Sequence, residues 1–201
     1  MSNNRAKAKL CRRFGVNLFG SDKYNKILQR KPSRPGMHGA RFNKKSEYGR
    51  QLDEKQKCRF VFGVTEKKMQ RYFKKATSQE GDTGQNFLRL FECRLDNVVY
   101  ISQFAVTRPQ ARQMVTHGHF KLNGRRVNIP SILVRPGDVI ELMPKVAKSS
   151  LYSDLSSLKD YSPKWLKADF KKARVEVLAL PEQDDLEKSI DAQLIVEFYS
   201  R

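Results

Sequence analysis

Apolar residues recur at the spacing of an amphipathic helix between residues 46 and 93, and this pattern predicts three consecutive helices. Ser46 and Thr65 each precede one of these helices, a position that favours hydroxyl side chains because they accept hydrogen bonds from free backbone N–H groups, and Thr83 opens the third. The remaining helical positions are mostly charged, so we expect each helix to bury one apolar stripe and to expose a basic face. In the second helix the stripe consists of Met69, Tyr72, Phe73 and Ala76.

The next fifty residues form a module with a different pattern, in which two short helices precede alternating segments that predict strands. Asp96 and Thr107 are placed to cap these helices, and Gly118 should end the second one in a left-handed conformation. Asn123-Gly124 is typical of a type I′ hairpin turn. The helices are expected at 97–102 and 108–117, and the strands at 119–122, 125–129 and 139–143.

The two ends of the chain differ from this module and from each other. Residues 1–45 are basic, rich in Gly, Pro and Asn, and poor in periodic apolar residues, so we expect an arm that is irregular until it meets a partner. Its segment KPSRPGMHG can be neither a helix nor a central strand, because proline disrupts both. Near the other end, residues 174–180 alternate as a strand does, and the apolar tail DAQLIVEFYSR is suited to pack back onto the helices.

These elements predict an α+β fold. We expect a mostly helical first domain with an inserted RNA-binding module, in which two helices pack on a short, three-stranded antiparallel β-ribbon. The predicted domains are a basic N-terminal arm at 1–45, a helical domain at 46–93 that 159–201 completes, and the inserted module at 94–158.

The distribution of charge indicates a binding partner. The formal net charge of +19 is unevenly distributed along the chain. Residues 1–75 hold 22 Lys and Arg against 5 Asp and Glu, whereas the last twenty residues hold 2 against 6. Charge of this size repels itself unless a polyanion neutralises it, and nucleic acid releases counterions for each cation laid on a phosphate. A merely solvated basic surface or an anionic membrane surface are the alternatives. The concentration of the charge, and the lack of a basic helix with a matching apolar face, favour nucleic acid.

Composition limits the cellular compartments in which the protein is expected. No run of about eighteen apolar residues occurs, so the sequence predicts no membrane span. The first fifteen residues lack the apolar region of a secretory signal, which argues against secretion. Cys11, Cys58 and Cys93 are odd in number and lack the spacing of a disulfide framework. We therefore expect a reducing, cytoplasmic location.

Many stretches of the chain resemble the bacterial small-subunit ribosomal protein S-four family, which gave the S4-type RNA-binding module its name. The module alone is moderately specific, because several RNA-modifying enzymes and a tRNA synthetase carry relatives of it. The flanking blocks extend the resemblance to nearly the whole chain and make it specific. The matching blocks are KLCRR at 9–13, PGMHGAR at 35–41, SEYGRQLDEKQKCRFVFGV at 46–64, RYFKKA at 71–76, RLDNVVY at 94–100, ARQMVTHGHFKLNGR at 111–125 and LIVEFYS at 194–200.

This resemblance implies a structural constituent of the small ribosomal subunit that is a primary binder of its 16S ribosomal RNA (rRNA). Family members nucleate assembly of the 30S body at a multi-helix RNA junction and lie near messenger RNA at the entry channel. They contact the fifth and third small-subunit proteins, and the interface with the fifth influences translational accuracy. Some members also repress their own messenger.

The chain departs from the family at one point. Some members carry an amino-terminal zinc site that begins Cys-x-x-Cys, but here Ala8 and Cys11 occupy the matching positions. His38 is the only histidine within reach. One thiolate and one imidazole are too few for a four-ligand zinc site, so we predict a zinc-free variant without a cofactor.

The candidate RNA-binding residues are cationic or hydrogen-bonding, because double-stranded RNA offers phosphates and 2′-hydroxyls while its deep groove hides the base edges. Arg108 and Arg112 lie four apart on one helix, so both are expected to reach the same RNA backbone. For His117 and His119 a hydrogen bond to local backbone is the alternative. The predicted rRNA-binding residues are Arg12, Arg13, Arg34, Arg41, Lys44, Lys45, Arg50, Lys55, Lys57, Arg59, Lys67, Lys68, Arg71, Arg108, Arg112, His117, His119, Lys121, Asn123, Arg125 and Arg126.

Two other functions compete with RNA binding of this kind. An RNA-modifying enzyme would place the module beside a catalytic domain, and Asp96 within Arg-Leu-Asp is shared with pseudouridine-forming enzymes. The flanks hold no phosphate-binding Gly loop, metal cluster or nucleophile–base motif, and Asp96 more simply caps its helix and pairs with Arg94. A general nucleic-acid compactor would need charge without an ordered array, and only a specificity ratio separates it from a specific binder. We therefore expect a binding protein and not an enzyme.

Overall fold

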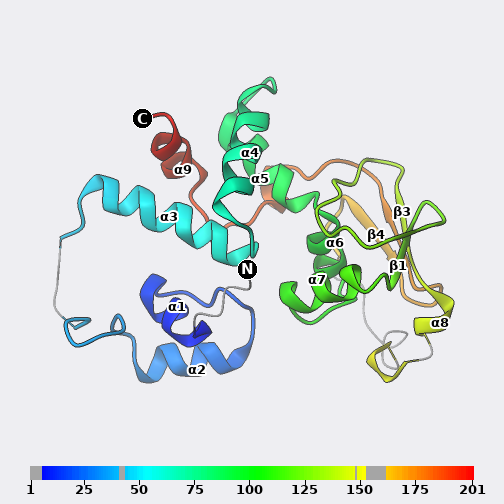
Figure 1. Cartoon of the computed structure of the whole chain (residues 1–201), viewed down its shortest axis with the longest axis horizontal. Coiled ribbons are helices and arrows are strands. Elements are labelled where there is room, and N and C mark those ends of the chain that lie inside the picture. The colour runs from blue at the N-terminus through cyan, green and yellow to red at the C-terminus, as the bar shows by residue number, and fades with distance from the viewer. Residues whose placement is uncertain (1–5, 41–43, 148, 153–161) are drawn as a thin grey trace. The chain divides into compact units, whose positions relative to one another are not determined.

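The computed structural model of the chain divides into two compact units, and its elements are labelled in Figure 1. Met1–Gly84 and Ser189–Arg201 form the first unit, and Gln85–Lys188 form the second. The last segment of the chain therefore returns to the unit in which the chain begins. The residues that the structure describes are 6–40, 44–147, 149–152 and 162–201.

These boundaries differ from the predicted ones. We expected residues 85–93 and 159–188 to belong to the helical domain, whereas their described parts lie in the second unit. The physical reason is backbone pairing, because the strands between residues 162 and 188 are hydrogen-bonded to the sheet of the module.

The first unit is helical, as its apolar pattern predicts. Its helices are α1 (Lys7–Phe14), α2 (Asp22–Arg30), α3 (Glu47–Val61), α4 (Glu66–Thr77) and α9 (Ala192–Tyr199). Helix α9 packs against α3, and the Gln51 side chain donates a hydrogen bond to Glu197 at 2.9 Å. The Tyr199 hydroxyl also donates to Glu66 on α4, at 2.7 Å. The prediction that the apolar tail packs back onto the helices is confirmed.

Residues 6–40 are more regular than their composition predicts, and the expectation of an irregular arm is wrong for α1 and α2. Leu10, Cys11 and Leu18 are buried, and Gly15 ends α1 with a φ of 71°. Removing these side chains from water stabilises the segment without a partner. The KPSRPGMHG segment forms only turns and bends, as predicted.

The second unit combines helices with a sheet. The helices are α5 (Thr83–Glu92), whose first two residues belong to the first unit, α6 (Leu95–Ile101), α7 (Arg108–Thr116), α8 (Pro144–Ala147) and the 3₁₀ turns η1 (Ser150–Tyr152) and η3 (Gln183–Asp185). The strands are β1 (Phe120–Leu122), β2 (Arg125–Val127), β3 (Val139–Leu142), β4 (Leu166–Asp169) and β5 (Arg174–Val177). Within the described residues these strands make one antiparallel sheet in the order β2-β1-β3-β5-β4.

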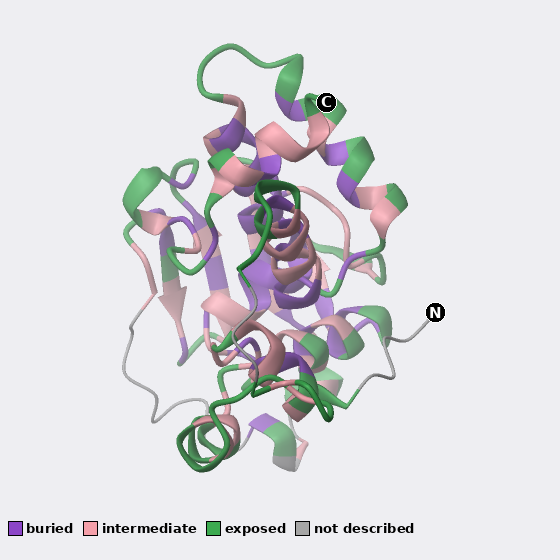
Figure 2. Cartoon of the chain, turned by 90° about the vertical axis from the view of Figure 1, so that its left-hand side faces the viewer, coloured by how far each residue is buried: buried purple, intermediate pink, exposed green. Residues whose placement is uncertain are grey.

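The sheet is larger than the predicted three-stranded ribbon. Strand β3 has a free edge after pairing with β1, and β5 pairs there with Ile140 opposite Val175. Burial alternates along both β3 and β5, which is the pattern of strands with one face on a core. Figure 2 colours each described residue of the chain by its burial. The alternation at 174–180 therefore indicated a strand correctly, but it could not indicate which domain that strand joins.

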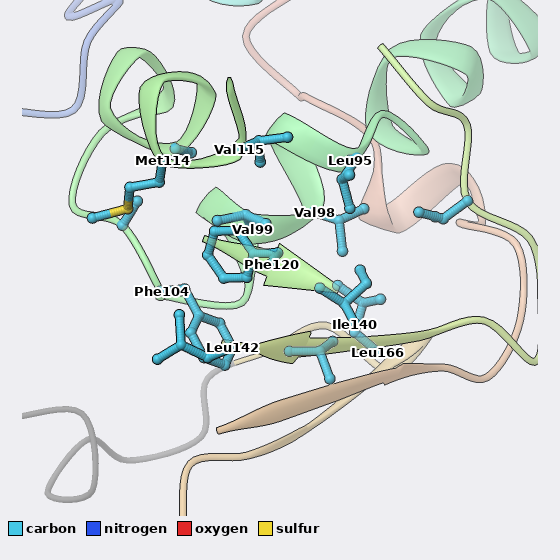
Figure 3. Close-up of a cluster of buried hydrophobic side chains, with 14 of the residues drawn as sticks. Leu95, Val98, Val99, Phe104, Met114, Val115, Phe120, Ile140, Leu142 and Leu166 are labelled. Atoms are coloured by element: carbon cyan, nitrogen blue, oxygen red, sulfur yellow. The ribbon is translucent and has the colours of Figure 1, made fainter. Parts of the chain in front are cut away.

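The core of the second unit lies between the helices α6 and α7 and the sheet (Figure 3). Val98 and Val99 face it from α6, Val115 from α7, and Phe120 and Ile140 from the strands. Each of these side chains is buried, so truncating any of them would leave a cavity. This packed core holds the α7 end and the β1–β2 hairpin as one rigid support.

Candidate nucleic-acid interface

Three cations from separate segments of the first unit converge on Asp53 of α3. The Arg13 Nη2 atom lies 3.0 Å from Asp53 Oδ1, while Arg34 Nη2 and Lys45 Nζ lie 3.1 and 2.7 Å from Oδ2. Arg12 supports the group, because its guanidinium donates hydrogen bonds to backbone carbonyl oxygens in the segment that carries Arg34. We call Asp53, Arg13, Arg34 and Lys45 the arm cluster.

The arm cluster displays more positive charge than it neutralises. Burial alone would raise the pKa of Asp53, but hydrogen bonds and attraction from Lys45 and Arg13 outweigh it and hold the pKa below its ordinary value. One carboxylate therefore faces three cations, whose side chains are 38–44% exposed. The sequence predicted the cations as RNA ligands but not the acid that gathers them.

Helix α4 presents a basic outer face. Its apolar residues Met69, Tyr72 and Ala76 are buried, as the helical spacing predicts, so its cations face the other way. Lys67 and Arg71 are exposed one turn apart and are suited to follow a phosphate backbone. The predicted cations of the first unit that are exposed or half-buried outside the arm cluster are Arg12, Lys44, Arg50, Lys57, Arg59, Lys67, Lys68 and Arg71.

Lys55 is a predicted RNA-binding residue that the structure buries. Its side chain is only 6% exposed, its Nζ lies 3.0 Å from Glu66 Oε2, and it stands 4.8 Å from the centre of the Phe198 ring. An enclosed ammonium with an anionic partner has no surface to offer a phosphate, so Lys55 belongs to the interior. Lys57 and Arg59 each contact the side chain three residues earlier on α3, at 3.0 and 3.1 Å, and stay half-buried.

In the second unit, the end of α7 and the β1–β2 hairpin are joined through Arg126. Its Nε donates to the Gly118 carbonyl oxygen at 3.2 Å, and its Nη2 donates to that of His117 at 3.3 Å. A Cβ atom at Gly118 would lie 2.6 Å from Arg126 Nε, and Gly118 has a φ of 70°, so only glycine fits this junction. We call the side chains that surround the junction the hairpin cluster. It consists of His117, His119, Lys121, Arg125 and Arg126.

His119 has a partner that neither predicted alternative included. Its Nδ1 lies 3.0 Å from the Tyr152 hydroxyl oxygen, so it is bonded to a side chain from η1 rather than to local backbone. Burial, and then repulsion from His117 and Arg126, lower the pKa of His119. His119 is therefore a neutral hydrogen-bonding group near pH 7, while the charge of the hairpin cluster comes from its Lys and Arg.

Asn123 serves the hairpin turn. Its side-chain Nδ2 donates to Asp138 Oδ1, and its Oδ1 accepts from the Val139 backbone N–H, both at 2.8 Å. The φ angles of Asn123 and Gly124 are 51° and 78°, which confirms the predicted type I′ turn. Both ends of the amide are hydrogen-bonded within the protein, which disfavours Asn123 as an RNA ligand.

Arg108 belongs to an internal network at the start of α7. Its Nε donates to Asn97 Oδ1 at 2.9 Å, and its Nη2 donates to Glu187 Oε2 at 2.7 Å. Asn97 in turn donates to Glu92 Oε2 at 2.6 Å. The Arg108 guanidinium also lies 4.7 Å from the centre of the Tyr100 ring. We call Glu92, Asn97, Arg108 and Glu187 the buried network, in which Glu92 and Asn97 are buried and Arg108 and Glu187 are half-buried.

The surroundings of the buried network disfavour RNA. Glu92 is 2% exposed, and its burial raises the pKa to about 7, although attraction to Arg108 and the hydrogen bond from Asn97 oppose the shift. Arg108 borders a hollow of about 420 Å³ that is also lined by Asp184, Asp185 and Glu187. Acidic side chains repel phosphate, although Lys188 also lines this hollow, so the surroundings of Arg108 disfavour it as an RNA ligand. That Arg108 and Arg112 reach one RNA backbone stays a prediction.

Arg112 remains partly available, with a side chain 41% exposed. Its Nη1 lies 3.8 Å from Asp96 Oδ2, and the same oxygen lies 2.6 Å from Arg94 Nη2. The predicted ion pair between Arg94 and Asp96 is thus confirmed. The predicted capping role of Asp96 is wrong, because α6 starts at Leu95 and its N-cap residue is Arg94.

The structure thus places many of the predicted cations in the arm cluster, on the outer face of α4 or in the hairpin cluster, and it encloses three predicted residues within the protein. Arg41 lies outside the described residues. Asp53 and Glu92 were not predicted as site residues, although the acidic pair Asp53-Glu54 inside a run of cations is a signal that could have found Asp53. Among the described residues, no group of three or more His, Cys, Asp and Glu is arranged to hold a metal ion. Within the same residues, no helix is long and apolar enough to span a membrane.

Comparison with known proteins identifies the family. Residues 2–92 match the family described as ribosomal protein S4/S9 N-terminal domain, and residues 93–140 match the S4 domain. The small ribosomal subunit protein uS4 of Desulfitobacterium hafniense is 49% identical over 96% of this chain and 96% of its own length. That of Borrelia duttonii is 45% identical over 98% of this chain and 96% of its own length. The resemblance in the sequence motifs is confirmed, and the chain belongs to the uS4 family of small-subunit ribosomal proteins, which are structural constituents of the ribosome and not enzymes.

Proposed function

We propose that this chain is a primary binder of small-subunit (16S) rRNA. Its first unit would contact the RNA through the arm cluster and the basic outer face of α4 (the α4 face), and its second unit would do so separately through the hairpin cluster. The observation that carries the proposal is that exposed cations stand on packed elements with fixed geometry. A general nucleic-acid compactor needs positive charge alone. A protein that recognises the shape of an RNA needs cations at fixed distances from one another.

The proposed surface retains most of the residues that the sequence indicated. Lys55, Arg108 and Asn123 are left out because their polar groups are occupied inside the protein. Arg41 stays a prediction. The residues proposed to bind rRNA are Arg12, Arg13, Arg34, Lys44, Lys45, Arg50, Lys57, Arg59, Lys67, Lys68, Arg71, Arg112, His117, His119, Lys121, Arg125 and Arg126.

Filter binding to 16S rRNA and to an unrelated structured RNA, at one moderate salt concentration with competitor, tests this proposal. We expect the affinity for 16S rRNA to be higher by about a thousandfold or more, as for other specific nucleic-acid binders. A ratio near one would leave only a general nucleic-acid compactor.

A variant of the hairpin cluster tests the contact surface directly. Arg125→Ala should weaken 16S rRNA binding by about 1–3 kcal/mol, by analogy with an arginine that makes a bidentate nucleic-acid contact. Arg174→Ala is the matched control, because it removes an arginine with a partly exposed side chain from β5, outside the hairpin cluster, where it pairs with Glu176 at 3.6 Å. Equal losses for both variants, or equal losses on both RNAs, would contradict a specific surface at the hairpin.

We further propose the finer roles that family membership suggests. These are nucleation of 30S assembly, contact with the fifth and third small-subunit proteins and with messenger RNA near the entry channel, and an influence on translational accuracy. Repression of the chain's own messenger and a cytoplasmic location on the ribosome belong to the same set. Reconstitution of the small subunit with and without the chain tests the first role. Normal incorporation of later proteins in its absence would refute nucleation.

A further inference from the structure

Asp53 is out of place for an RNA-binding surface, because a carboxylate repels phosphate. It nevertheless contacts Arg13 from α1, Arg34 from the turns after α2, and Lys45 just before α3. These four residues are spread over forty positions of the sequence, and only the fold brings them together. An acid that contacts three proposed RNA ligands at once calls for an explanation other than local charge balance.

The contacts leave the cations able to bind a further anion. Arg13 and Arg34 each reach Asp53 through one Nη2 atom, and a guanidinium carries five N–H donors. Their side chains are 38% and 44% exposed, and that of Lys45 is 39% exposed. With one negative charge against three positive ones, the arm cluster keeps two net positive charges on its outer side.

We propose that Asp53 is a positioning residue of the RNA interface, which holds Arg13, Arg34 and Lys45 in a phosphate-binding array without touching the RNA itself. This inference rests on the proposed function and adds the means by which one part of the surface is organised. The bound group would be a backbone phosphate of rRNA, which the three cations approach together.

The physical argument is preorganisation. Long cationic side chains lose rotamer freedom when they bind, and three like charges at close range repel one another. Asp53 meets both costs before RNA arrives, because its two oxygens fix the three nitrogen atoms and offset their repulsion. Arg12 adds rigidity to the array by tying α1 to the segment of Arg34 through backbone carbonyl oxygens.

Asp53→Asn provides a test in which two explanations predict opposite signs. The variant gains one unit of positive charge, so charge alone would strengthen binding to every RNA. If Asp53 organises the array, affinity for 16S rRNA falls about tenfold, the scale of one charge-assisted hydrogen bond, while affinity for unrelated RNA holds or rises. Glu47→Gln is the matched control, because it changes the charge equally at an exposed position of α3 outside the arm cluster.

A double-mutant cycle separates positioning from a general effect on the fold. In a chain that carries Arg13→Gln, Arg34→Gln and Lys45→Gln, adding Asp53→Asn should not lower the 16S rRNA affinity any further. A further loss in that background would mean that Asp53 acts through the fold, and would overturn the inference. So would an unchanged or higher specific affinity of the single variant.

Nuclear magnetic resonance supplies a readout that needs no RNA. The Nε–H order parameters of Arg13 and Arg34 should fall in Asp53→Asn at a temperature where circular dichroism matches the parent chain, and unchanged values would overturn the inference. If the parent chain itself binds 16S rRNA no better than unrelated RNA, the proposed function fails instead. That failure is distinct, because the order parameters report the array by itself.

Discussion

The arm cluster and the buried network both contain pairs of cations and carboxylates, but they differ in how far the cations are exposed. Both join arginine to carboxylate across distant segments of the chain. In the arm cluster the acid has a lowered pKa and its cations remain exposed, whereas in the buried network Glu92 has its pKa raised to about 7 and Arg108 is enclosed by acidic neighbours. Burial, and not residue type, decides whether a cation stays exposed to a ligand or is paired inside the protein.

The difference explains which predicted residues survive as candidate ligands. Partial exposure keeps solvent screening around Arg13 and Arg34 and leaves donors that face outward. Enclosure commits Arg108 to Asn97 and Glu187. A cation therefore belongs to an RNA surface only if its partner leaves part of it in water.

Breaking an enclosed pair should have the largest effect on stability. Asp96→Ala removes the carboxylate that lies 2.6 Å from Arg94, whose side chain is 1% exposed. We expect the free energy of unfolding to fall by about 3–5 kcal/mol, because a buried charge loses its counter-charge. Urea unfolding measures the loss. The control Arg174→Ala, in a pair exposed by 41% on both sides, should change stability by less than about 1 kcal/mol.

Neutralising Glu92 should have a smaller effect on the free energy of unfolding, which depends on pH. It should stabilise the folded chain, whereas Asp96→Ala destabilises it. Its pKa is raised in the folded chain from an ordinary value of 4.5 to about 7, so the folded state binds this proton more tightly. Stability from this group is full below pH 4.5 and is lost as pH rises towards 7. Glu92→Gln keeps the acceptor without the charge. It should match the parent chain near pH 4.5 and exceed it by at most about 3 kcal/mol at pH 8.

Unfolding free energies of the parent chain and Glu92→Gln, measured by urea titration across this pH range, check the sign. A constant difference between pH 4.5 and 8 would mean that Glu92 is already ionised in the folded chain throughout, and the contrast with Asp53 would then disappear.

Asp53→Asn should have the smallest effect on stability. Each of its ion pairs involves a cation that is at least 38% exposed, so the total loss should be about 1 kcal/mol after solvent screening. The contribution of Asp53 to stability changes with pH in the opposite direction to that of Glu92. Because the folded-state pKa of Asp53 is lowered, its contribution is full above the ordinary value of 3.8 and disappears as pH falls further. Thermal unfolding of the parent chain and of Asp53→Asn, at pH 7 and below pH 3, measures this loss of stability. A larger loss at low pH would contradict this account.

Much of the fold could be predicted from local pattern. The caps Ser46 and Thr107 accept the expected backbone hydrogen bonds from Gly49 and Gln110, and Gly118 adopts the left-handed conformation. These features depend on a few neighbouring residues, which is why they can be predicted. The pairing of β5 with β3 depends on residues more than thirty positions apart, and no local pattern indicates it.

The candidate site divides in the same way. The cations of the hairpin cluster follow from their residue types and from a turn that Asn123 and Gly124 specify. That Lys55 is enclosed by Glu66 and Phe198, and Arg108 by Asn97 and Glu187, depends on partners brought in by α4, α9 and the segment before Ser189. Residue type indicated cations correctly and could not indicate which ones the fold would bury.

The sequence by itself determined the family, the α+β class, the turns and caps, and a positive charge that calls for a polyanion. These properties depend on residue type and on spacing over a few positions. The tertiary structure alone decided that α1 and α2 are ordered, that β4 and β5 extend the sheet, and that Asp53 gathers three cations while Glu92 is shielded from water. Such outcomes depend on burial and on contacts between distant segments, because the strength of a charge interaction is set by the solvent that remains around it.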